Sequence, residues 1–129
     1  MEQNIWRDHK VLELICDALG EVKKAANGSG RAYMTTYQLA IKIDRDHPEV
    51  RRALGVGIGG VGTGRHDSFP QYLGRELSRR SGKEGFPVEM AYLSNDHVTT
   101  ATFEAAGGKE ITSSLTGTGY FTSLFRLRD

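Results

Sequence analysis

The hydrophobic pattern of this chain changes once, at Pro87, and this change limits the fold more than any other feature. Before Pro87, apolar residues recur at the 3.6-residue spacing of a helix, and after it they alternate with the period of two that indicates strands. Helices are predicted at about 4–26, 36–43, 49–54 and 69–80, with a short strand at 32–35. Helices first and strands afterwards predict an α+β fold.

Four segments after Pro87 are rich in Thr, Val, Phe and Tyr and are predicted to be strands. They are residues 88–93, 97–104, 110–116 and 120–127. The segments between them contain Asn95-Asp96, Gly107-Gly108 and Gly117-Thr118-Gly119, which favour tight turns. We therefore expect a four-stranded antiparallel meander. The apolar faces of its first and last strands are expected to pack on the helices: Val88, Met90, Tyr92, Phe121, Phe125 and Leu127.

The length and composition are typical of one globular domain. The chain has 129 residues, of which 38% are apolar and 26% charged. We expect a single domain over 1–129, helical over about 4–81 and with a sheet over about 87–127. No long apolar run or basic leader is present, which favours a cytoplasmic protein that does not enter a membrane. Cys16 is the only cysteine, which excludes an intramolecular disulfide and a cysteine-built zinc site.

A glycine-rich segment at 55–64 leads through Arg65-His66-Asp67-Ser68 into the helix predicted at 69–80. Glycine lets backbone N–H groups approach an anion, and a helix N-terminus offers unpaired N–H groups to negative charge. We expect a phosphate-binding loop that uses Gly57, Gly59, Gly60, Gly62 and Gly64. A dinucleotide fingerprint is excluded because the preceding segment is helical, and a P-loop because Thr63 stands where lysine is needed. The alternative is a segment that merely links two helices.

Positive charge is concentrated in the middle of the chain. Residues 49–84 hold seven Lys or Arg and four Asp or Glu, a local charge of +3 in a chain whose total is +1. A patch with this positive charge is a modest indication of nucleic-acid binding. The competing interpretation is a solvated helix face on which Glu76 pairs with Arg79 and with Arg75 or Arg80.

The helix predicted at 69–80 has two distinct faces. Its inner face holds Phe69, Tyr72, Leu73 and Leu77. The outer face holds Gln71, Arg75, Ser78 and Arg79, at the steps of four, three and one that a groove-reading helix uses. Arginine can donate two parallel hydrogen bonds to guanine or phosphate, and glutamine can read adenine.

The order of helix, short strand, two helices and hairpin resembles a winged helix-turn-helix domain, with the segment from Tyr33 to Ala40 similar to its strand-to-helix junction. The resemblance covers about residues 6–116 and implies a duplex DNA partner. It implies that Gln71, Arg75, Ser78 and Arg79 enter the major groove and that Gly107-Gly108-Lys109 is the wing tip. Arg65, Lys109 and the glycine amides would then contact the DNA backbone. The chain departs from the family in its long segment at 45–67 and in its fourth strand.

No catalytic residue, metal ligand or cofactor is predicted. The four histidines are scattered and lack the spacing of metal ligands: His9, His47, His66 and His97. His66, Asp67 and Ser68 are the residue types of a hydrolytic triad, but neighbours in sequence cannot align three side chains in one hydrogen-bonded chain. Asp67 or Ser68 is better explained as a helix cap. We therefore expect a binding protein and not an enzyme.

Two other functions stay open. The first is a protein-interaction module or homodimeric adaptor that uses an edge strand or the first helix, whose broad apolar arc includes Trp6, Leu12 and Leu19. A homodimer fits this function and DNA binding equally. The second is a small-ligand domain with a pocket near the glycine-rich segment.

Overall fold

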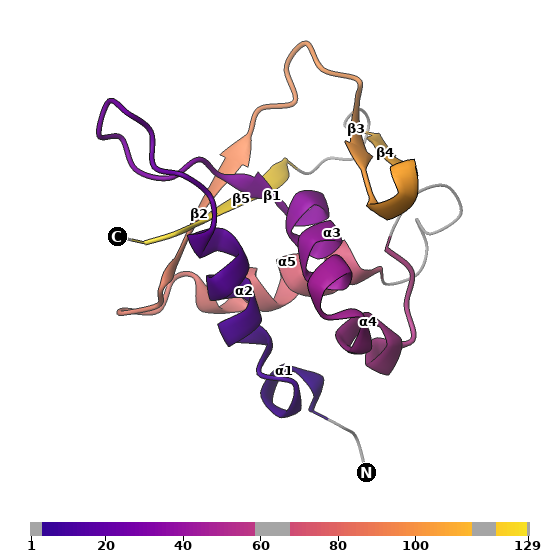
Figure 1. The fold of residues 1–129 in the computed structure, drawn as a ribbon. Coiled ribbons are helices and arrows are strands. Elements are labelled where there is room, and N and C mark those ends of the chain that lie inside the picture. Colours follow the sequence, from indigo (N-terminus) through magenta and orange to yellow (C-terminus); the bar gives the residue numbers. More distant parts are fainter. Residues whose placement is uncertain (1–3, 59–67, 115–120, 129) are drawn as a thin grey trace.

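A computed structural model describes residues 4–58, 68–114 and 121–128, which form an α+β structure (Figure 1). Its helices are α1 Ile5–Asp8, α2 Val11–Gly20, α3 Thr36–Asp46, α4 Pro48–Leu54 and α5 Phe69–Arg80, with a 3-10 turn at Ala106–Gly108. The strands are β1 Met34–Thr35, β2 Val88–Leu93, β3 Thr100–Glu104, β4 Glu110–Ser114 and β5 Thr122–Leu127. In the part of the chain described, no helix has the length and apolar character needed to cross a bilayer.

The single helix expected at 4–26 is wrong, because the chain bends at Lys10 and the second helix ends at Gly20. Lys10 has a left-handed backbone with φ 52°, which separates α1 from α2. Arg31 Nη1 donates to the carbonyls of Gly20 at 3.1 Å and Val22 at 2.7 Å. The guanidinium of Arg31, eleven residues after Gly20, therefore binds carbonyls that backbone N–H groups would bind if the helix continued.

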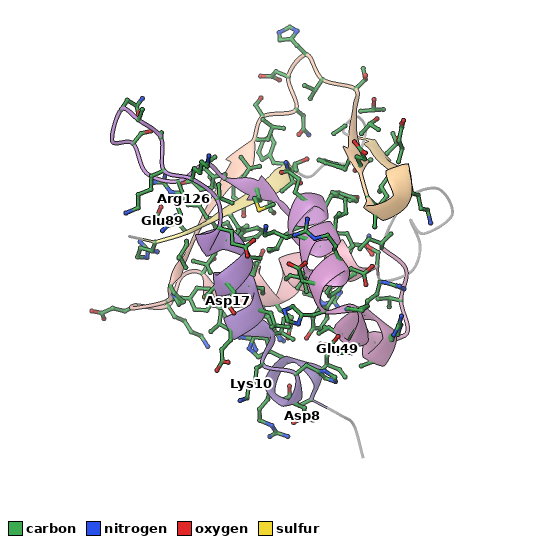
Figure 2. All side chains as sticks on the ribbon, in the orientation of Figure 1. Asp8, Lys10, Asp17, Glu49, Glu89 and Arg126 are labelled. Carbon is green, nitrogen blue, oxygen red and sulfur yellow. The ribbon has the colours of Figure 1, made fainter. Side chains whose placement is uncertain are left out.

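The segment after α2 folds back toward the sheet that contains β2 and β5. Arg126 on β5 donates to Glu89 on β2 at 2.5 Å and to the carbonyl of Ser29 at 2.9 Å (Figure 2). Its guanidinium also lies 4.6 Å from the ring centroid of Tyr33. These contacts fix the 21–33 segment to the sheet without any helical structure of its own.

Helices α3 and α5 begin with the same capping motif. Thr35 Oγ1 accepts from the N–H of Gln38 at 3.2 Å, and Gln38 Oε1 accepts from the N–H of Thr35 at 2.7 Å. Ser68 and Gln71 make the same reciprocal pair at 3.3 and 3.0 Å. Both are capping boxes. Of the two residues predicted to cap the helix at 69–80, Ser68 is the one that does so.

The expected four-stranded meander is wrong in its pairing. One sheet has the order β1-β5-β2, and β3 and β4 form a separate pair. Along its whole length β2 pairs with β5, from Val88 opposite Leu127 to Leu93 opposite Thr122. The β3–β4 hairpin does turn at the predicted Gly107-Gly108, whose φ values of 76° and 77° suit glycine. The turn expected at 117–119 lies outside the described residues.

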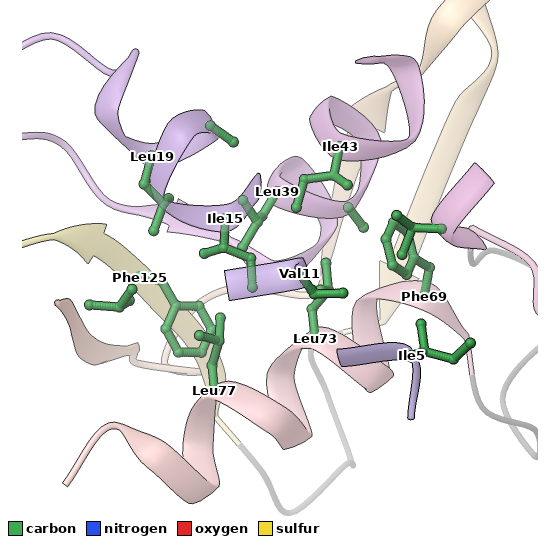
Figure 3. Close-up of a cluster of buried hydrophobic side chains, with 14 residues drawn as sticks. Ile5, Val11, Ile15, Leu19, Leu39, Ile43, Phe69, Leu73, Leu77 and Phe125 are labelled. Carbon is green, nitrogen blue, oxygen red and sulfur yellow. The ribbon is translucent and has the colours of Figure 1, made fainter. Parts of the chain in front are cut away.

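One core joins α2, α3 and α5 to the inner face of the three-stranded sheet (Figure 3). Its largest fully buried side chains include Ile15, Leu19, Leu39, Ile43, Phe69, Leu73, Leu77 and Phe125. Tyr92 and Phe121, expected on the packed face, are instead 60% and 58% exposed. The sheet therefore extends beyond the helices that cover its other end.

The β3–β4 hairpin contacts α3 and, in the described residues, does not pair with the three-stranded sheet. Phe103 stacks on Tyr37 with ring centroids 5.2 Å apart and an interplanar angle of 6°. Ser113 Oγ donates to the Tyr37 hydroxyl at 3.0 Å, and Ile111 is buried. Tyr37 therefore fixes where the hairpin sits.

Gly74 allows the close packing of α5 on the start of α3, since an added Cβ would lie 3.2 Å from Thr36 Cγ2. We expect Gly74→Ala to raise the free energy of unfolding by about 1 kcal/mol in a Thr36→Ser background, because alanine is the better helix former. In the wild-type background the gain should be smaller, since the new methyl presses on Thr36. Urea unfolding of the four proteins measures this coupling, and equal gains in both backgrounds would contradict it.

Candidate nucleic-acid interface

The exposed face of α5 carries the four side chains that its sequence spacing predicts. Gln71, Arg75, Ser78 and Arg79 are exposed, while Phe69, Leu73 and Leu77 are fully buried on the opposite side. These two faces follow from the i, i+4, i+8 spacing of the buried residues. The helix therefore presents two arginines, one turn apart, outside the core.

The N-terminus of α5 does not offer the N–H groups that we expected for a phosphate. The N–H of Ser68 donates to Gln71 Oε1, and the N–H of Gln71 donates to Ser68 Oγ. Phe69 donates its N–H to the carbonyl of Gly57 at 2.8 Å, and Pro70 has no N–H. Every backbone donor from Ser68 to Gln71 is therefore satisfied within the protein.

The same capping box changes the role expected for Gln71. Reading adenine in the major groove requires the glutamine oxygen to accept and its nitrogen to donate. In the structure the oxygen accepts from the N–H of Ser68 at 3.0 Å. This hydrogen bond holds the Gln71 side chain against the start of its own helix, so Gln71 would have to share or release it to read adenine.

Glu76 binds the two arginines in the last turn of α5. Arg79 Nη2 donates to Glu76 Oε2, and Arg80 Nη1 lies 3.5 Å from Glu76 Oε1 and 2.9 Å from its carbonyl oxygen. The Glu76 side chain is only 12% exposed, whereas that of Arg79 is 62% exposed. The pairing considered as the alternative to DNA contact is thus present, but Arg79 still reaches solvent.

Arg80 differs from its neighbour because it packs on an aromatic ring. Its guanidinium carbon lies 4.1 Å from the ring centroid of Trp6, a cation–π contact between α5 and α1. No signal in the sequence indicates this contact, since the two residues lie near opposite ends of the helical region. Arg80 is therefore turned toward the first helix.

The structure places Lys109 apart from the α5 face. Lys109 borders a hollow whose other lining residues come from α3, α4, the segment after α4 and the hairpin turn, among them Asp44, Arg45 and Arg51. Arg51 Nε donates to Asp44 Oδ1 at 2.8 Å, and its Nη1 donates to the carbonyl of Val56 at 3.2 Å. The wing tip and the reading helix therefore do not form one continuous site in the described residues.

Several predicted site residues lie outside the described part of the chain: Arg65 and the loop glycines Gly59, Gly60, Gly62 and Gly64. Gly57 is exposed, and its carbonyl accepts from α5 as described above. The expected phosphate loop therefore stays a prediction.

The residues predicted for a dimer contact have unequal exposure. Leu19 is 1% exposed and belongs to the core, so it has no surface to offer a second chain. Trp6 and Leu12 are partly buried and pack against the same core. An interface through this region would therefore have to use Trp6 or Leu12 without Leu19.

The described residues contain no group of three His, Cys, Asp or Glu that could hold a metal ion. Burial raises the pKa of the Cys16 thiol, and the charge of Asp17 adds to this effect. Cys16 is therefore held as a thiol, which is a poor nucleophile.

Comparisons with protein-family models, curated proteins and solved structures find no match.

Tyr72 on α5 has a pKa far from its ordinary value, although the sequence indicated only an aromatic residue on the inner face of the helix. Its hydroxyl is buried and has no hydrogen-bond partner in the described part of the chain. Burial, followed by the charge of Glu76, raises the pKa of Tyr72 to about 12. A phenol with this pKa is neutral and able to donate at physiological pH.

This shift predicts a pH dependence of stability. Between pH 10 and about 12 the unfolded chain releases the Tyr72 proton while the folded chain retains it, so the free energy of unfolding falls as the pH rises. Tyr72→Phe should therefore lose less stability than the wild type over this range in urea unfolding. Tyr92→Phe removes an exposed hydroxyl and should behave as the wild type. Identical pH profiles for Tyr72→Phe and the wild type would contradict the assignment.

Proposed function

We propose that this chain is a winged-helix-like DNA-binding protein that contacts duplex DNA through α5. The observation that carries the proposal is the exposed face of α5, where Arg75, Ser78 and Arg79 project opposite the buried stripe. The helix is fixed by α3 on one side and by the sheet core on another. A rigid helix with projecting arginines is suited to a groove.

The topology supports the winged-helix resemblance. A strand, β1, precedes α3, and α5 is followed by β2. The last strand, β5, lies between them in one small antiparallel sheet of order β1-β5-β2. In this proposal the chain between β2 and β5, which includes the β3–β4 hairpin, corresponds to an enlarged wing that rests on α3 through Tyr37.

The chemistry of the face favours the phosphate backbone and guanine. Arg75 and Arg79 are four residues apart, or about 6 Å along the helix axis, so both can reach one strand of a duplex. Guanidinium groups donate in pairs to phosphate oxygens or to the O6 and N7 atoms of guanine. Because the backbone donors at the start of α5 are satisfied, side chains supply the binding energy in this proposal.

Salt-dependent DNA binding tests the proposal directly. Fluorescence anisotropy with a random-sequence duplex should show an affinity that weakens as salt rises, because bound counterions are released. Arg75→Ala/Arg79→Ala should weaken binding and reduce the slope of log affinity against log salt by about 2, roughly one for each phosphate that the variant no longer reaches.

The matched control removes the same charge from other helices. Arg7→Ala/Arg52→Ala takes two exposed arginines from α1 and α4 and should retain more of the affinity and the salt slope. Equal losses of affinity in the two double variants would indicate a general charge effect and would contradict a specific role of α5. Absence of binding even at low salt would contradict DNA binding altogether.

A substitution of Glu76 is expected to change DNA affinity in the opposite direction. Glu76→Gln removes the carboxylate that binds Arg79 and Arg80, so both the local charge and the availability of Arg79 increase. We expect DNA affinity to rise severalfold and the salt slope to steepen. Glu49→Gln on α4 is the matched control and should change affinity less. Unchanged or weaker binding by a folded Glu76→Gln protein would argue against Arg79 as a contact.

A second candidate function is a protein-interaction module. Tyr92 and Phe121 lie with ring centroids 6.2 Å apart at the exposed end of the β2–β5 pair, and Leu93 beside them is 39% exposed. Exposed aromatic residues next to an edge strand are a common binding surface. This candidate becomes the leading one if the DNA experiment shows no binding.

A further inference from the structure

The outer edge of β2 is unpaired in the described residues. One side of β2 pairs with β5, and no described strand pairs with the other side. The N–H of Arg128 donates to the carbonyl of Pro87 at 2.7 Å, and this pair continues the β2–β5 register. Because hydrogen-bonded and non-hydrogen-bonded pairs alternate in an antiparallel ladder, Met90 and Tyr92 direct their backbone N–H and C=O groups away from β5. None of these four groups has a hydrogen-bond partner among the described residues.

Exposed apolar side chains gather at the same edge. The large hydrophobic side chains that are exposed in the described residues are Tyr92, Leu93 and Phe121. All three lie at the end of the β2–β5 pair that extends beyond the helices (Figure 1). From Met90 to Ser94 the chain has no charged residue and no proline, which are the features that protect an edge strand from pairing. This edge is therefore suited to pair with another strand.

Helix α5 limits the register in which two copies of this edge can meet. Ser78 and Ser81 hold α5 against β2, with hydroxyl oxygens 3.9 and 3.5 Å from Met90 Sδ. Pairing Met90 with Met90 of a second copy would crowd two α5 helices, each net positive, over strands only about 4.8 Å apart, whereas packed helices need about 8–10 Å. Pairing Tyr92 with Tyr92 instead separates the two Met90 residues by four positions, or roughly 13 Å along the strands.

We propose that β2 pairs antiparallel with β2 of a second copy of this chain, about a two-fold axis at Tyr92. The two three-stranded sheets then form one continuous sheet. Tyr92 and Phe121 of each copy form a row of four aromatic side chains across the contact, and Leu93 lies opposite Ala91 of the second copy on the other face. One self-complementary contact covers the exposed apolar side chains and the unpaired backbone groups, and no like charges meet in it.

The size of this contact predicts a reversible dimer. A fully buried aromatic side chain covers roughly 150–250 Å², and Tyr92 and Phe121 are 60% and 58% exposed, so four rings contribute on the order of 500 Å². Interfaces below about 1,200 Å² are characteristic of transient complexes. The dimer goes beyond DNA binding, since it uses the edge of β2 and neither arginine of the exposed α5 face. Failure of DNA binding would therefore leave it intact.

Sedimentation equilibrium of the full chain tests the contact. From micromolar to millimolar concentration, the mass should rise from that of one chain toward twice that value. Tyr92→Lys places two like charges opposite each other at the two-fold axis and should weaken dimerisation at least about tenfold. The matched control, Thr100→Lys, adds the same charge to an exposed position on β3 and should dimerise as the wild type does. A wild type that stays monomeric, or a Tyr92→Lys variant that dimerises equally well, would overturn the proposal.

Cross-linking tests the register without changing Tyr92. In a Cys16→Ser background, Ala91→Cys/Leu93→Cys places thiols opposite each other in a non-hydrogen-bonded pair, with Cα atoms about 4.5 Å apart and within disulfide range. Mild oxidation should link two chains at least about tenfold faster than in either single variant, whose thiol lies opposite an unchanged Ala or Leu. Equal rates in the double and single variants would overturn pairing centred on Tyr92.

Discussion

Burial of one face of α5 is the constraint on which the rest of the structure depends. Phe69, Leu73 and Leu77 are fully buried in the core that α2, α3 and the three-stranded sheet share. Because these residues lie four apart on one side of the helix, Arg75 and Arg79 are necessarily directed away from the core. The absence of a side chain at position 74 lets α5 approach α3 closely. The proposed DNA-binding face is thus a geometric consequence of the core.

The two ends of α5 are stabilised by different chemistry. At its start, the capping box and the carbonyl of Gly57 satisfy the backbone donors, so the helix has no open N–H cradle for a phosphate in the described residues. At its end, Glu76 binds two arginines and sets how much positive charge reaches solvent. The proposed recognition of an anion by this helix therefore depends on side chains, whose positive charge Glu76 neutralises only in part.

Local signals predicted the parts of the fold that local hydrogen bonds define. The bounds of α5 and β2 agree with the predicted 69–80 and 88–93, and the predicted Ser68 caps α5 in the same way as Thr35 caps α3. The S/T-x-x-Q spacing at both caps could have revealed that Gln71 is committed to its own helix. The helix expected at 4–26 failed because Arg31, distant in sequence, binds the carbonyls at its true end.

The sequence alone determined where most helices and strands lie and which side of α5 faces outward, because those properties repeat along the chain with a local period. It did not determine the break at Lys10, the end of α2 at Gly20 or the start of β3 at Thr100. Only the tertiary structure decided what each segment contacts. The pairing of β5 with both β1 and β2, the seating of the hairpin on Tyr37 and the packing of Arg80 on Trp6 all join distant residues. Periodicity records that a side chain is buried but carries no information about its partner. The sheet order and the charge balance around Arg79 therefore became visible only in three dimensions.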